Sequence, residues 1–167
     1  MRAIILTSMI ICLGIVSAAA NVNREEAAVA AIKELGGTVE YGEGRRARNV
    51  VSVDLSGSKA GNADLRHLVG LKYVRDLNLS GTSISTGTQY IAFLKELRTL
   101  DLSGTNVDDD NLARLSNLKK LEKISLRGTA VTEEGVRSIA RISTLKTIDI
   151  ARAQTADAAL QLVSMLF

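Results

Sequence analysis

The feature that most constrains this chain is a pattern of apolar residues that recurs every 23 or 24 residues. The clearest copy is Leu97–Val107, where the residues follow the spacing L-x-x-L-x-L-x-x-T-x-V. Related copies begin at Val50, Val74, Leu121 and Leu145. One residue per copy marks the same place and gives steps of 24, 23, 24 and 24 residues: Leu55, Leu79, Leu102, Leu126 and Ile150. A period of this length predicts a solenoid, in which each copy forms one coil.

Each copy predicts a short strand followed by a short helical segment. In the first copy Val53 and Leu55 point to one side of the strand and Asp54 to the other, which is the alternation of a strand with one buried face. Three leucines then follow at intervals of three, which only helical or near-helical backbone places on one side: Leu65, Leu68 and Leu71. Stacking about five such coils merges their apolar faces into one core, so the fold class expected is an α/β solenoid with parallel strands.

A Ser-Gly-Thr or Arg-Gly-Thr triplet follows three of the predicted strands and must turn the chain out of the sheet. The glycines permit a backbone that a Cβ would hinder: Gly57, Gly81, Gly104 and Gly128. The threonines are expected to be buried and to donate their hydroxyls to backbone groups of the turn: Thr82, Thr105 and Thr129.

These motifs resemble leucine-rich repeats, in particular the exported bacterial type with repeats of the form LxxLxLSGTxVTDxGL. They are similar to cysteine-containing leucine-rich repeats, with Thr in the Cys position. The resemblance covers residues 50–166. It implies a curved right-handed solenoid with strands on the concave face, short helices on the convex face, and protein binding as the commonest role. The chain departs from the pattern at Ser58 and Ala153, which replace the Thr, and in a second coil that is one residue short near Ser85–Gln89.

Three segments are expected: a signal peptide over residues 1–20, an N-terminal capping unit over 21–49 and the repeat array over 50–167. Asn23–Leu35 is predicted to be the capping helix that covers the open face of the first coil, and Thr38–Tyr41 a short strand. The loop that follows, Gly42–Asn49, holds a basic cluster at Arg45, Arg46 and Arg48. We interpret this cluster as a solvated loop, with an anion site as the alternative.

The first twenty residues place Arg2 before the apolar run Ala3–Val16 and then small residues, the order of a secretory signal peptide. Cleavage fits after Ala20 or after Ala18, and the alternative is an uncleaved membrane anchor. Export to the periplasm, the cell surface or the medium is therefore expected, with no membrane span after cleavage. Cleavage would also remove Cys12, the only cysteine, so the fold must depend on its core.

Little in the sequence indicates a catalytic, nucleotide-binding or metal-binding site. His67 is the only histidine, and no nucleophile, nucleotide or zinc motif is present. The run Asp108–Asp110 lacks the spacing of a calcium loop and is explained by a helix start, where carboxylates are favoured. We therefore expect no enzyme, cofactor or metal. The excess of Lys and Arg over Asp and Glu is only 21 to 18, so a nucleic-acid partner is not expected either.

The outward positions of the predicted strands form the candidate site. They are small and polar and contain no aromatic residue, and Asp76 and Asp101 are expected to share one acidic column. The binding residues proposed are Asp54, Asp76, Asn78, Thr99, Asp101, Lys123, Ser125, Arg127 and Asp149. The hypothesis is a protein-interaction module that uses this concave face, and a soluble face with no partner is the plain alternative.

A second hypothesis concerns the end of the chain, which is apolar over Val163–Phe167. Either Met165–Phe167 folds back over the last coil, or this end meets another molecule, since terminal repeats ordinarily need a polar outer side. The protein would then be a structural or envelope-associated spacer that assembles through its ends. A monomer is expected, with end-to-end association as the alternative.

Overall fold

The structure is a computed structural model that describes residues 24–151. Three of the expectations above lie outside the described residues: the signal peptide, the helix cap at Asn23 and the folding of residues 152–167.

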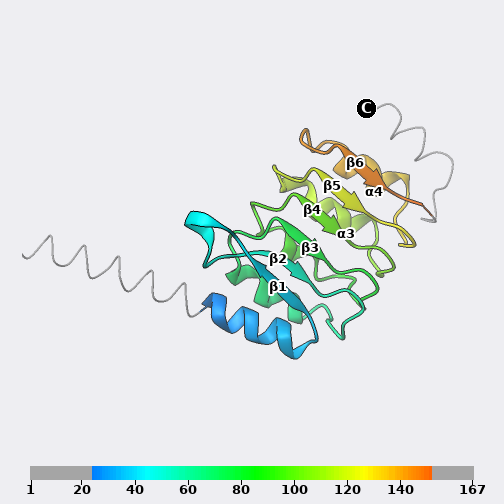
Figure 1. Ribbon diagram of the computed structural model, residues 1–167. Helices are drawn as coiled ribbons and strands as arrows, with labels where there is room; N and C mark the ends of the chain where they lie inside the picture. The colour runs from blue at the N-terminus through cyan, green and yellow to red at the C-terminus, as the bar shows by residue number, and fades with distance from the viewer. Residues whose placement is uncertain (1–23, 152–167) are drawn as a thin grey trace, which may run out of the picture.

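Six strands form a single sheet in the order β1-β2-β3-β4-β5-β6 (Figure 1). β1 pairs antiparallel with β2, and every later pair is parallel. The strands are β1 Thr38–Tyr41, β2 Val50–Asp54, β3 Asp76–Asn78, β4 Thr99–Asp101, β5 Lys123–Ser125 and β6 Thr147–Asp149. Because strands of successive coils are neighbours in the sheet, the predicted stack of coils is confirmed.

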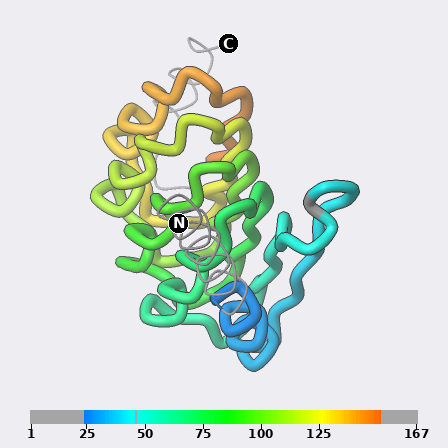
Figure 2. The backbone as a smooth tube through the Cα atoms, turned by 90° about the vertical axis from the view of Figure 1, so that its left-hand side faces the viewer, coloured from blue at the N-terminus to red at the C-terminus, as the bar shows by residue number. Residues whose placement is uncertain are grey.

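A second layer of short helical segments lies behind the sheet and connects one strand to the next (Figure 1). These segments are η2 Asp64–Gly70, α2 Thr88–Ile91, α3 Asp109–Ala113, η3 Arg114–Asn117 and α4 Glu133–Ile139, while η1 Gly44–Arg46 lies between β1 and β2. Figure 2, turned by 90°, shows the coils stacked on one another, with the β1–β2 connection in cyan projecting beside them. The near-helical segment expected after the first strand is a 3-10 helix.

The core lies between the two layers and is built from ladders of apolar side chains. In the sheet, Leu100 of β4 pairs with Leu77 of β3 and with Ile124 of β5. The ladder continues to Val53 and Ile148. Leu77, Leu100 and Ile124 are 2%, 0% and 0% exposed. Each coil therefore buries its apolar face against the coils on both sides, as stacking requires.

The turns after the strands are built as the triplets predict. Gly81 and Gly104 have φ angles of +68° and +65°, which a residue with a Cβ rarely adopts. The threonine hydroxyls are buried and donate to the carbonyl three residues earlier, from Thr82 to Leu79 at 2.6 Å, from Thr105 to Leu102 at 2.6 Å and from Thr129 to Leu126 at 2.7 Å. The first turn differs, because its Ser58 hydroxyl accepts from the amide of Ala60 at 3.2 Å.

The N-terminal cap is a helix over residues 24–34 followed by β1. Gly36, with φ of +88°, ends the helix as the Gly-Gly pair predicts. Ala28, Val29 and Ile32 are buried, and the Glu25 carboxylate accepts from the Val50 amide at 2.6 Å. Side-chain packing and this hydrogen bond join the helix to the first coil, so it covers the open end of the array.

The missing residue of the second coil is accommodated by the first coil. The side-chain oxygen Oδ1 of Asn62 accepts from the backbone amides of Ser85 at 2.8 Å and Gly87 at 3.0 Å, just before α2 begins. α2 itself has no side-chain cap at its N-terminus. An amide from the neighbouring coil thus satisfies backbone donors that the shortened turn leaves without a partner of its own.

Two aspartates at the start of α3 have different hydrogen-bond partners. Asp108 caps the helix by accepting from the Asn111 amide at 3.0 Å. Asp109 accepts from the amide of Thr132 at 2.7 Å and from its hydroxyl at 2.5 Å. The helix-start explanation is therefore confirmed for Asp108, whereas Asp109 also joins the third coil to the fourth.

Candidate functional site: the concave sheet face

The outward strand residues form two columns across β2 to β6. The first column holds Ser52, Asp76, Thr99, Lys123 and Thr147. The second column holds Asp54, Asn78, Asp101, Ser125 and Asp149. Adjacent members of a column lie on neighbouring strands, about 4.8 Å apart. The strands thus bring eight of the nine predicted site residues together, and Arg127 lies just beyond the end of β5.

The second column is part of the turns as well as of the surface. An oxygen of Asp54, Asn78, Asp101 or Asp149 accepts a hydrogen bond from the amide two residues later, at 2.8, 3.0, 2.8 and 3.2 Å. Asp101 also accepts from the Ser103 hydroxyl at 2.5 Å. These acceptors satisfy a free amide after β2, β3, β4 and β6, as an Asx turn does. The repeated acidic residues are therefore explained by the fold.

One expectation about this face is wrong. Asp76 and Asp101 do not share a column, because Asp76 pairs with Thr99 and Asp101 pairs with Asn78. Carboxylates alternate with neutral residues in the second column, so no continuous acidic stripe forms. Ser125 points outward but is only 9% exposed, and its hydroxyl lies 2.7 Å from that of Ser103.

Charged groups of both signs remain accessible on the concave face. Asp76, Lys123 and Arg127 are exposed. Arg127 lies 3.6 Å from a carboxylate oxygen of Asp149, a loose ion pair between the fourth and fifth coils. Within residues 24–151, the structure gives the side chains of Asp76 and Lys123 no hydrogen-bond partner. These two side chains and Arg127 are therefore the groups of this face that a partner can contact without disturbing a turn.

A second polar surface was not predicted. It consists of the four loops that lead into β3 to β6, residues 72–75, 95–98, 119–122 and 143–146, and we call it the basic edge. These loops hold seven cations and two carboxylates. The repeat itself carries the signal, because Lys72, Lys95 and Lys119 follow one another at 23 and 24 residues.

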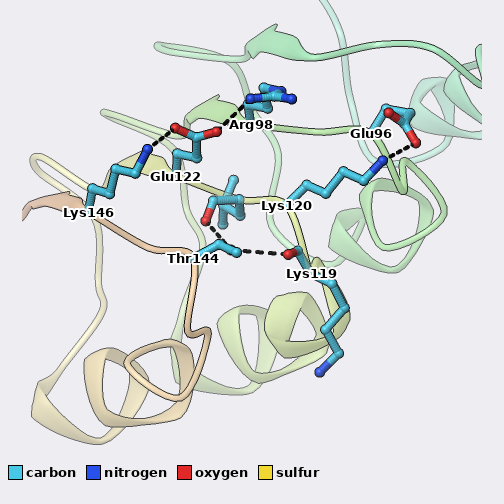
Figure 3. Close-up of polar contacts among 8 residues, drawn as sticks. Glu96, Arg98, Lys119, Lys120, Glu122, Thr144 and Lys146 are labelled. Atoms are coloured by element: carbon cyan, nitrogen blue, oxygen red, sulfur yellow. Dashed lines mark hydrogen bonds and ion pairs between the residues drawn. The ribbon is translucent and has the colours of Figure 1, made fainter.

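The carboxylates of the basic edge pair with cations of neighbouring coils (Figure 3). The two oxygens of Glu122 contact Arg98 at 2.7 Å and Lys146 at 2.6 Å. Glu96 contacts Lys120 at 2.6 Å. The hydrogen bond and positive charge of Lys146, with a smaller contribution from Arg98, lower the pKa of Glu122 below its ordinary value. Glu122 therefore stays ionised and links three successive coils.

The remaining features of the described part of the chain include His67 and two clefts near the N-terminal helix. No three His, Cys, Asp or Glu side chains within residues 24–151 are grouped as metal ligands. His67 is half-buried on η2 and lines a shallow cleft with Arg24, Arg66 and Val69. A cleft of about 540 Å³ lies between the N-terminal helix and the β1–β2 connection, where Val29 and Tyr41 line it. No helix within residues 24–151 combines the length and apolarity needed to span a membrane.

No protein-family model matches the chain, and neither does any curated protein. Solved structures do match. A chain of the BIR3–SERK2 complex from Arabidopsis thaliana has 20% identity and a TM-score of 0.52, over 68% of this chain and 61% of that chain. The tropomodulin C-terminal domain from Caenorhabditis elegans has 16% identity and a TM-score of 0.58, over 84% and 89%. An internalin from Listeria monocytogenes has 14% identity and a TM-score of 0.51, over 86% and 47%.

The match spans less than two thirds of the plant and Listeria chains. Sequence identities of 14–20% indicate a shared fold and nothing more. Parallel strands on one layer, short helices on the other and a period of 23 or 24 residues agree with these neighbours. The chain has the α/β fold of a leucine-rich repeat solenoid.

Proposed function

We propose that this chain is an exported, non-enzymatic protein-interaction module that binds its partner through the concave sheet face. The observation that carries the proposal is the division of that face into two columns. The second column is held by hydrogen bonds to its own turns. The second column therefore stays in place for the turns, and the exposed charges outside it, Asp76, Lys123 and Arg127, remain accessible to a partner.

The exposed groups define the chemistry of the partner. Asp76, Lys123 and Arg127 offer charges of both signs to an opposing surface. No outward residue of β2 to β6 is aromatic, so the anchors must be polar, and arginine is the residue type here that is enriched at interface hot spots. We infer a polar partner surface that presents a cation toward Asp76 and acceptors toward Lys123 and Arg127.

Two further observations support the proposal. One similar structure is a chain of a protein–protein complex, the BIR3–SERK2 complex. The pattern of residues 1–20 supports export to the periplasm, the cell surface or the medium. Fractionation of cells that express the full chain, with the mass of the mature protein, would test this part: a mass that retains residues 1–20 in the cytoplasmic fraction would contradict it.

Site-specific photo-crosslinking tests the binding face. A photoreactive amino acid is placed at Lys123 on the concave face in one variant and at Gln89, which is exposed on α2, in the other. Irradiation of intact cells should produce a protein adduct from position 123 and none from position 89. An adduct from position 89 alone would contradict the proposal. An adduct with the mass of two copies of this chain would favour the alternative of self-assembly.

A further inference from the structure

The basic edge is a continuous surface because the loops that form it are bonded to one another. The amide of Arg75 donates to the carbonyl of Val51 at 2.7 Å, that of Arg98 to Arg75 at 2.7 Å, and that of Glu122 to Arg98 at 2.8 Å. The amide of Lys146 continues the series by donating to Glu122 at 2.8 Å. Residues at equivalent positions of these loops are therefore neighbours at the strand spacing of about 4.8 Å.

One row of this edge holds a lysine in each of three successive loops. Lys72 lies three residues before Arg75, Lys95 three before Arg98, and Lys119 three before Glu122. At the strand spacing, the row spans about 10 Å along the stack.

The charge of the molecule is concentrated here. The whole chain has a formal net charge of +3, whereas the four loops of the basic edge alone have an excess of five positive charges. The remainder of the chain therefore has a net charge of −2. The small basic excess of the chain is therefore gathered at one edge of the sheet.

The edge does not neutralise itself. Its seven cations outnumber its two carboxylates. Glu122 bridges Arg98 and Lys146, Glu96 pairs with Lys120, and Lys72 and Glu96 also have further interaction partners. Lys119 extends away from these pairs in Figure 3. The Lys95 ammonium donates to the neutral carbonyl of Ala92 at 2.7 Å. Like charges on neighbouring coils repel one another, and bound anions would reduce that repulsion.

We propose that the basic edge binds a linear anionic polysaccharide that lies along the stack, across the row Lys72, Lys95 and Lys119. Lysine ammonium groups on flexible stems suit anionic groups whose exact geometry varies from one sugar to the next. Single-stranded nucleic acid is disfavoured, because such sites stack successive bases on several aromatic rings and the basic edge contains one, Tyr73. This surface is separate from the concave face, so the proposal does not depend on the proposed function.

The test measures the binding of fluorescently labelled probes by fluorescence anisotropy. The protein used is the mature chain if residues 1–20 are cleaved in the cell, and the complete chain if they are not. The probes are labelled heparin and polygalacturonate oligosaccharides, a single-stranded oligothymidylate of equal charge, and a neutral dextran. The edge variant is Lys72→Gln with Lys95→Gln and Lys119→Gln. The matched control removes the same charge from the convex side as Arg66→Gln with Arg114→Gln and Arg141→Gln, all of which are exposed positions.

The edge variant should lose roughly tenfold or more in affinity for the anionic oligosaccharides. The slope of log K against the logarithm of the salt concentration should become less negative by about two. The control variant should stay within about twofold of the wild type. A second edge variant with arginine at the same three positions should restore binding, which excludes lost folding as the cause.

Three results would overturn the proposal. Equal losses in the edge and control variants would show that net charge, and not this edge, determines binding. Tighter binding of the oligothymidylate than of either anionic oligosaccharide would assign the edge to nucleic acid. Binding of neutral dextran as tight as that of heparin, or no binding of any anionic probe by the wild type at low salt, would remove the electrostatic argument altogether.

Discussion

The second column of the concave face and the basic edge are both rows of polar residues that recur once per coil, but they contact different groups. The side chains of the column accept from backbone amides of their own coil, as Asp101 does from Ser103. The ion pairs of the basic edge join side chains of different coils, as Glu122 does with Arg98 and Lys146. The second column therefore supplies hydrogen bonds that the turns use, whereas the ion pairs of the basic edge contribute none to the turns.

This difference separates two reasons why a residue recurs in a repeat protein. A recurring acceptor that lies two residues before a turn amide is explained by the backbone of four of the five coils. Lys119, on an exposed loop, has no such backbone bond from its side chain within residues 24–151, whereas Lys95 donates to the Ala92 carbonyl. Recurrence without a backbone reason is the stronger indication of a ligand.

The largest expected effect concerns the turn on which both surfaces depend. Thr105→Val keeps the volume of a side chain that is 3% exposed but removes its 2.6 Å hydrogen bond to the Leu102 carbonyl. We expect a loss of about 1–2 kcal/mol in the free energy of unfolding. Urea denaturation measures it, and Thr105→Ser, which keeps the hydroxyl, should lose less. A neutral Thr105→Val would mean that the hydroxyl only fills space.

A smaller effect distinguishes the two columns of the concave face. Asp101→Ala removes the acceptor of the Ser103 amide and hydroxyl, so we expect it to cost about 0.5–1.5 kcal/mol. Asp76→Ala, in the first column, should change stability by less than about 0.5 kcal/mol. The same denaturation experiment compares the two variants. Equal values would contradict the assignment of a structural role to the second column alone.

The sequence alone predicts the fold well because spacing and residue class agree in every copy. The buried ladder at Leu77, Leu100 and Ile124 and the hydroxyl bonds of Thr82, Thr105 and Thr129 follow from that spacing. Even the cap could be anticipated, since an apolar stripe before Gly36 and Gly37 has to cover the first coil.

The candidate site was harder to predict, for two physical reasons. Strand alternation shows that Asp76 and Asp101 point outward, but the register decides their columns, and it depends on how neighbouring coils pair. Alternation also says nothing of turn hydrogen bonds, so it does not reveal that Asp101 accepts from the Ser103 amide. The net charge of the chain does not reveal the basic edge, because the edge depends on the position of each lysine in its coil.

The smallest expected effect tests whether the ion pairs of the basic edge contribute to stability at all. Glu122→Gln removes the negative charge between Arg98 and Lys146 but keeps the shape of the side chain. It should lower the melting temperature slightly at pH 7, by less than Asp101→Ala, because exposed ion pairs are screened by water. Added salt should reduce the difference further.

The pH dependence of that difference has a definite sign. The pKa of Glu122 is lower in the folded protein than in the unfolded chain, mainly because of Lys146. Its contribution is therefore fully present above the ordinary glutamate pKa of about 4.3 and is lost as the pH falls through the lower folded value. Melting curves of the wild type and Glu122→Gln should be separated at pH 7 and should converge by about pH 3. A separation that is constant from pH 7 to pH 3 would show that the glutamine acts through packing, and the basic edge would then resemble the second column in being part of the fold.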